Sequence, residues 1–418
     1  MKTSSRPKNS LTGLLVDTWW YGLTQRVSAE DFLALADLRA HQGFSAVQLV
    51  VGIPPEVGPA NPNAASIVGP AWNLQGNLNR RYLQLAAQRI SLLNDRRLRV
   101  IVYGAWGHQI SWLGRQKMVS WWQEIVNHLD DLDVIYCLTG ESNLFIGRED
   151  ILLPDRSTMA LRRSRIRSWL PQSLTMPVRK VIRRWRARRP QQNLSLRRRR
   201  QEDWSYVLDA LAQMTARPLI IHTNAGETGW QVVNNPQHLA ANTTQTGHSR
   251  QTRNDLWQIP IRETKGDPRQ IFINLEPWYE GINNDYYTFD QLYAYWVTML
   301  AGAASYCYGA HGIWNAGDGH FLAHWGRQTF AQAQLLDTPR LLGSSHEQFL
   351  AYPDLQHTSF QTNGERLVAI TRRGPDQAIT FYPDIAAAPP PPEGRYWQTL
   401  NGHYSADPPA NGPLVVFH

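Results

Sequence analysis

The sequence has few of the residues that define several large protein classes. It contains only two cysteines, Cys137 and Cys307, which excludes a disulfide framework and a cysteine-rich metal site. Both cysteines lie inside apolar runs, so we expect them to be buried and inert thiols. The apolar runs extend over only a few residues, far short of the roughly 18 residues that span a bilayer. HExxH spacing and phosphate-binding glycine loops are also lacking, so no metal or organic cofactor is expected.

The rest of the composition is that of a globular chain. Of the 418 residues, 42% are hydrophobic and 18% are charged, which is enough apolar material for a large core. The first ten residues, MKTSSRPKNS, are charged, but the apolar segment of a secretory signal does not follow them. We therefore expect a cytoplasmic location, while an extracellular or periplasmic location stays open.

The net charge of +8 comes from one segment. Residues 156–200 contain 16 Lys and Arg and no Asp or Glu, which leaves 26 basic against 34 acidic residues elsewhere. This distribution argues against a specific nucleic-acid partner for the fold as a whole. The basic residues belong to an insertion at about 151–201, so any anionic surface or polymer is expected to bind through 156–200.

Within this insertion, residues 178–189 have the pattern of an amphipathic helix. The apolar positions at helical spacing are Val178, Val181, Ile182 and Trp185, and arginines fill the opposite face. Such a helix fits an anionic membrane surface, or a lid over a site for an acidic polysaccharide. A solvated, partly unfolded loop is the third interpretation, because arginine-rich tracts without acidic partners often stay unfolded.

Short apolar runs that end in polar residues or glycine recur along the chain and predict strands buried on both faces. They cover residues 12–20, 44–52, 99–107, 133–143, 218–227, 255–261, 271–280 and 307–315. Helical periodicity fills much of the intervening sequence, at 28–43, 79–97, 117–132, 202–216 and 288–305. This alternation predicts a (β/α)₈ barrel over residues 11–343, with a doubly wound open sheet as the alternative. Residues 344–418, with hairpin-like runs and a proline-rich loop, predict a small β domain that packs on the barrel.

The active site of a (β/α)₈ barrel lies at the carboxyl ends of its strands, where this sequence places carboxylates, aromatics, amides and histidines. Glu141 and Glu276 follow the fourth and seventh predicted strands and would face each other across the barrel mouth. Retaining glycosidases need such a pair about 5–5.5 Å apart, one carboxylate as nucleophile and the other as acid/base. Either residue could instead be a barrel-mouth residue without a catalytic role. The residues expected to bind substrate around this pair are Asp17, Trp20, His108, Asn143, His222, Tyr279, Glu280, His311 and Trp314.

Glu280 is the alternative nucleophile, because it lies four residues after Glu276 and would share its strand face. Glu276 is preferred because it directly follows the apolar run and precedes Pro277, which ends strand pairing.

The segments DTWW, GFSAVQLV, CLTGESN, NLEPWYEG and AGAASYCYGAHGIWN resemble, in this order, the apiosidase-like glycoside hydrolases over about residues 11–340. The resemblance implies a (β/α)₈ enzyme with a short C-terminal β-sandwich, with Glu276 at the nucleophile position and Glu141 at the acid/base position. Glu141 follows Thr-Gly here, where the family often has Asp after two glycines, which bears on the substrate more than on the reaction type. Characterised relatives cleave a furanoside of plant cell-wall polysaccharide.

The sequence therefore predicts a retaining glycoside hydrolase that acts on an oligo- or polysaccharide without a metal. Two other functions remain open: a carbohydrate-binding protein without turnover, and a surface-docking protein that acts through the basic insertion. The sugar, the linkage, exo or endo action and the oligomeric state are not indicated by the sequence.

Overall fold

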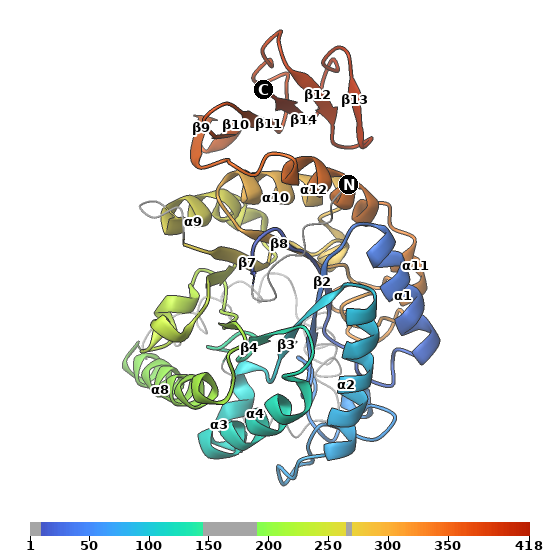
Figure 1. The fold of residues 1–418 in the computed structure, drawn as a ribbon, viewed down its shortest axis with the longest axis vertical. Helices are drawn as coiled ribbons and strands as arrows, with labels where there is room; N and C mark the ends of the chain where they lie inside the picture. Colours follow the sequence, from blue (N-terminus) through green and yellow to red (C-terminus); the bar gives the residue numbers. More distant parts are fainter. Residues whose placement is uncertain (1–9, 145–189, 265–269) are drawn as a thin grey trace, which may run out of the picture.

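The computed structural model describes residues 10–144, 190–264 and 270–418. Eight parallel strands form one sheet in the order β5-β4-β3-β2-β1-β8-β7-β6, with helices around the outside (Figure 1). The strands are β1 Leu15–Trp19, β2 Ala46–Val50, β3 Arg99–Tyr103, β4 Val134–Cys137, β5 Leu219–Ile220, β6 Asn242–Gln245, β7 Phe272–Glu276 and β8 Ser305–Tyr308. Every residue of these strands is buried, and so are both cysteines, as the apolar runs predicted. The predicted (β/α)₈ fold is confirmed.

The helices of the described residues are α1 Ala29–His41, α2 Arg80–Asp95, α3 Ile110–Leu113, α4 Arg115–Leu129, α8 Pro190–Met214, α9 Asp255–Thr264, α10 Thr288–Leu300, α11 Phe330–Gln334 and α12 Thr338–Leu350. Five of them, α1, α2, α4, α8 and α10, lie where the periodicity predicted a helix, although several differ in length, and the other four were not predicted. The side chain of Ser28 caps α1 by accepting a hydrogen bond from the backbone N–H of Asp31 at 2.9 Å. The helix expected at 178–189 lies outside the described residues, and the described part of the insertion is the beginning of α8.

The predicted sixth strand at 255–261 is wrong, because these residues form most of α9. The sixth strand is β6, whose sequence Asn-Thr-Thr-Gln is fully buried although all four residues are polar. The side chains of β6 bond to neighbouring segments: Thr243 donates to the carbonyl of Ile221 and Thr244 to the carbonyl of Glu227. Because β5 and β6 are the two ends of the strand order, these hydroxyls help to close the barrel where the backbone ladder stops.

The C-terminal residues form one six-stranded antiparallel sheet in the order β13-β12-β14-β11-β10-β9. Its strands are β9 His357–Asn363, β10 Arg366–Arg373, β11 Ala378–Tyr382, β12 Arg395–Gln398, β13 His403–Ser405 and β14 Leu414–Phe417. Trp296 of α10 packs on Phe381 and Phe417, with ring centroids 6.5 and 6.3 Å apart, and so joins the sheet to the barrel. Figure 1 shows the sheet lying beside α10 and α12. Helix α12 crosses the expected domain boundary at 343/344, so the sheet begins only at His357.

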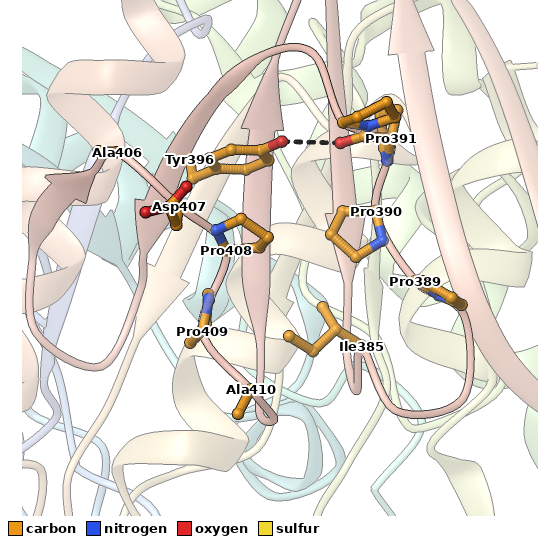
Figure 2. A pocket seen from close by; sticks show the side chains of 11 residues that line it. Ile385, Pro389, Pro390, Pro391, Tyr396, Ala406, Asp407, Pro408, Pro409 and Ala410 are labelled. Carbon is orange, nitrogen blue, oxygen red and sulfur yellow. Dashed lines mark hydrogen bonds between the residues drawn. The ribbon is translucent and has the colours of Figure 1, made fainter.

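Two proline-rich loops of this sheet face each other across a groove of about 530 Å³ (Figure 2). One loop carries Pro389–Pro392 and the other Pro408–Pro409. The hydroxyl of Tyr396 donates to the carbonyl of Pro391 at 2.8 Å, which fastens the first loop to β12. This hydrogen bond ties the proline-rich loop to the sheet.

Candidate active site

One cavity of about 140 Å³ lies at the carboxyl end of the barrel. Its walls come from segments that follow the strands, such as Trp20 after β1, Trp106 after β3 and Trp314 after β8. The full set of lining residues is Trp20, Pro55, Glu56, Trp106, Glu141, Gln245, Gly247, His248, Glu276, Tyr279, Ile282, Trp314 and Trp325. The two carboxylates predicted from the sequence to form a pair therefore line the same aromatic cavity.

Glu276, the last residue of β7, is held by two histidines. Nε2 of His248 lies 2.9 Å from Oε1, and Nε2 of His222 lies 3.4 Å from Oε2. The backbone N–H of Tyr279 donates to Nδ1 of His248 at 3.3 Å, and the backbone N–H of Glu141 donates to Nδ1 of His222 at 3.0 Å. Because Nδ1 accepts in both rings, the hydrogen of each neutral ring lies on Nε2. Each carboxylate oxygen of Glu276 thus faces a different ring N–H.

This arrangement favours an ionised Glu276. Burial acts to raise the pKa of the carboxyl, since the side chain is 7% exposed. The hydrogen bond from His248 and the electrostatic contact with His222 outweigh burial, so the pKa of Glu276 lies below its ordinary value. A carboxylate that stays ionised in an apolar cavity has the property that a nucleophile requires.

His222 is enclosed by aromatic rings. The rings of Trp20, Tyr103 and Trp106 lie 6.5, 5.8 and 6.1 Å from it, centroid to centroid. Burial lowers the pKa of His222 to about 4, so the ring is neutral at physiological pH. His222 therefore acts as an uncharged link between the backbone of Glu141 and the carboxylate of Glu276.

Glu141 lies in the loop after β4 and has an unusual backbone conformation. Its φ of 41° is in the left-handed region, which is costly for a residue with a Cβ. Its Oε2 accepts a hydrogen bond from the indole Nε1–H of Trp106 at 2.9 Å. The loop backbone fixes where Glu141 lies, and Trp106 fixes the direction of its carboxyl group.

Two glycines allow the loops that carry Trp106 and Glu141 to approach closely. A Cβ on Gly107 would lie 2.0 Å from the carbonyl oxygen of Glu141, and a Cβ on Gly140 would lie 2.3 Å from the ring of Trp106. The backbone N–H of Gly107 donates to the carbonyl of Gly140 at 2.7 Å. Only residues without a side chain fit between these segments.

The structure brings some of the predicted substrate-binding residues to the cavity and leaves others away from it. Trp20, Tyr279 and Trp314 line it, and His222 lies behind Glu276. Asp17 was expected to bind substrate but does not line the cavity. Its Oδ2 lies 2.6 Å from Nε of Arg39, and both side chains are fully buried. Asp17 therefore anchors α1 to β1 and is not placed to contact a substrate.

Glu280 is also corrected. The irregular segment 277–279 ends the strand, and Glu280 pairs with Ala310 after β8 instead of continuing the face of Glu276. Its carboxyl group accepts from Tyr308 at 2.6 Å and from Thr338 at 2.8 Å, and burial raises its pKa. Glu280 faces the junction of the barrel with α12, which is no place for the nucleophile.

The remaining three predicted residues surround the site without lining the cavity. His108 is buried beside the close approach at Gly107. Asn143 binds the loop after β5, donating to Oε2 of Glu227 at 3.0 Å. His311 packs on Trp314, with ring centroids 5.8 Å apart, and burial lowers its pKa to about 4. These positions suit residues that support the cavity walls.

Sequence reasoning missed several residues at the cavity, among them His248, Trp106, Glu56, Gln245 and Trp325. His248 follows β6, so the wrong sixth strand concealed it. Trp106 ends the third predicted run but was not selected. Within the described ranges, no group of three or more potential ligands could hold a metal ion, and no helix is both long and apolar enough to cross a membrane.

A model of the family described as "Apiosidase-like, catalytic domain" matches residues 13–333, the whole barrel with its carboxylate pair. The chain belongs to this family. The family and the fold support the general class of glycoside hydrolase for the apiosidase-like chain. No curated protein matches its sequence.

Solved structures share the fold of the apiosidase-like chain at low identity. A glycoside hydrolase family 5 protein from Bacteroides vulgatus is 14% identical with a TM-score of 0.67, over 97% of this chain and 88% of that one. A putative glycoside hydrolase from the same organism is 11% identical with a TM-score of 0.55, over 98% and 79% of the two chains. At this identity the likeness shows the fold, which in both cases extends over the C-terminal sheet.

Proposed function

We propose that the protein is a retaining glycoside hydrolase in which Glu276 is the nucleophile and Glu141 the acid/base. The observation that carries this proposal is that two carboxyl groups in one cavity have different surroundings. Glu276 accepts a hydrogen bond from His248, with Nε2 of His222 3.4 Å from its other oxygen, and its pKa is lowered, whereas the indole of Trp106 orients Glu141. A pair with one ionised and one protonated member is what double displacement requires.

In the first step an oxygen of Glu276 bonds to the anomeric carbon as the glycosidic bond breaks. The leaving oxygen takes the proton of Glu141, which becomes a carboxylate. In the second step Glu141 removes a proton from water, the water oxygen bonds to the anomeric carbon, and Glu276 is released as a carboxylate. Each residue returns to its initial protonation state, so no external acid or base is consumed.

The cavity favours a neutral sugar. Its walls contain the indoles of Trp20, Trp106, Trp314 and Trp325, which offer apolar faces to a sugar ring. Glu56 adds a third carboxylate, while no Lys or Arg occurs among the described residues that line the cavity. A uronic acid would meet like charge, so neutral glycosides are expected to bind better. The volume of about 140 Å³ lies below the range of about 300–1,000 Å³ of larger ligand sites, which suits a single sugar unit.

The test is turnover of 4-nitrophenyl furanosides and pyranosides by the wild type, Glu276→Ala and Glu141→Ala, with furanosides taken first because of the family. Both variants should lose several orders of magnitude of turnover while remaining folded. Azide should restore turnover of Glu141→Ala with a good leaving group, because azide attacks the glycosyl-enzyme without a general base. Glu280→Gln is the matched control, a carboxylate change four residues from Glu276 but outside the cavity. Binding of sugars without any turnover would favour the carbohydrate-binding alternative.

A further inference from the structure

The described end of the basic insertion reaches the loops of the active site through one side chain. Arg200, in α8, is buried, whereas the six residues before it are exposed. Its Nη1 donates to the carbonyl oxygens of Gly107, Ser142 at 3.3 Å and Leu144 at 3.1 Å, and its Nη2 donates to Oγ of Ser111 at 2.6 Å. One guanidinium therefore binds two separate loops.

These two loops are the ones that determine the position of Glu141. Ser142 and Leu144 directly follow Glu141, whose left-handed φ needs support from its surroundings. Gly107 directly follows Trp106, whose indole orients the Glu141 carboxyl group. Arg200 thus contacts the backbone next to Glu141 and the backbone next to the residue that orients it.

The chemistry of the contact requires arginine. The acceptors are three backbone carbonyls and a hydroxyl, which approach different nitrogens of a planar group that has five N–H donors. Burial lowers the pKa of Arg200 to about 10, opposed by the nearby charge of Asp203, so the group remains charged at neutral pH. All three carbonyls approach Nη1 and the Ser111 hydroxyl approaches Nη2, so a lysine, which has the charge but a single nitrogen, cannot make both sets of contacts in this geometry.

We propose, given the acid/base role of Glu141, that Arg200 is a positioning residue that holds the Glu141 loop against the Trp106 loop. Through Arg200 the basic insertion is coupled to proton donation in the active site. The consequence is specific: without Arg200, Glu141 protonates the leaving oxygen poorly, while attack by Glu276 is unimpaired. Turnover of substrates whose leaving group departs without protonation should then be little affected.

The experiment compares Arg200→Met and Arg200→Lys with the wild type on 2,4-dinitrophenyl and phenyl glycosides of the sugar found above. A misplaced general acid should lower kcat/KM for the phenyl glycoside by about 10²-fold, since general acids contribute roughly 10²–10⁴-fold, and for the dinitrophenyl glycoside by less than about tenfold. Arg198→Met, an exposed arginine two residues earlier on α8, is the matched control and should behave as wild type. Thermal unfolding verifies that each variant is folded.

A second readout does not depend on turnover. With ¹⁵N-indole-labelled tryptophan, the Nε1–H resonance of Trp106, assigned through Trp106→Phe, should shift in Arg200→Met, while that of Trp296 in α10 should not. Equal loss on both substrates, no loss, or an unchanged Trp106 resonance would each overturn the proposal. Glu141→Ala distinguishes this failure from failure of the proposed function: if Glu141→Ala discriminates between the leaving groups and Arg200→Met does not, only the role of Arg200 is refuted.

Discussion

Replacing His248 with alanine removes one of the two ring N–H groups that face Glu276. The 2.9 Å contact with Oε1 is the closer of the two. Hydrogen bonds to charged groups contribute roughly 1.5–3 kcal/mol, and one pKa unit corresponds to about 1.36 kcal/mol. The bond from His248 is one of the causes that hold the pKa of Glu276 below its ordinary value, so its removal should raise this pKa, although His222 still faces Oε2.

The assay is the pH dependence of kcat/KM with a 2,4-dinitrophenyl glycoside, which reports the free enzyme. A raised pKa protonates the nucleophile over a wider acidic range, so the acid limb should move to higher pH. The limb belongs to the coupled pair of carboxyl groups, so the comparison between variants is what counts. The control is His238→Ala, a 38%-exposed histidine that pairs with Asp209 and not with the cavity. An acid limb at the wild-type pH in His248→Ala would refute the assigned role of His248.

Three further predictions concern the surroundings of the pair. Gly107→Ala should lower both Tm and turnover, because its Cβ would lie 2.0 Å from the Glu141 carbonyl; wild-type values of both would contradict the close approach. Burial lowers the pKa of His311 from 6.5 to about 4, so the unfolded state binds the proton more readily. The resulting stability is complete above pH 6.5 and falls by up to about 3 kcal/mol towards pH 4, and urea unfolding of His311→Asn should show a shallower fall than the wild type. Glu280→Gln should lower Tm, through its bonds to Tyr308 and Thr338, but change kcat by less than about tenfold; a loss as large as that of Glu276→Ala would make Glu280 catalytic.

The sequence was sufficient to predict those strands of the barrel whose buried residues are mostly hydrophobic. Strand β7 is an apolar run that ends at Glu276, so both the strand and the position of this carboxylate followed from the pattern. Strand β6 is the opposite case. Its four residues are polar yet buried, and the hydroxyls of Thr243 and Thr244 bond to neighbouring backbone carbonyls across the end of the ladder. An apolar-run criterion cannot find such a strand, and His248, three residues after it, was missed with it.

The placement of single side chains could not be predicted where a distant partner decides it. Asp17 lies in the second half of the first predicted strand and was expected to bind substrate, but Arg39 of α1 pairs with it in the core. Glu280 has the spacing of a residue on the same face as Glu276, but after the irregular segment 277–279 its side chain bonds to Thr338 of α12. Both partners are far away in the sequence, and strand periodicity carries no information about them.

The central claim is that Glu276 forms the covalent intermediate. The most direct measurement is mass spectrometry of the protein after inactivation by a 2,4-dinitrophenyl 2-deoxy-2-fluoroglycoside of the preferred sugar. The fluorine slows both steps and the leaving group restores the first, so a glycosyl-enzyme should accumulate. The account predicts a mass increase of one fluoroglycosyl group, located by peptide mapping on Glu276. A label on Glu280 or Glu141, or turnover of the preferred glycoside with inversion at the anomeric carbon, would contradict it.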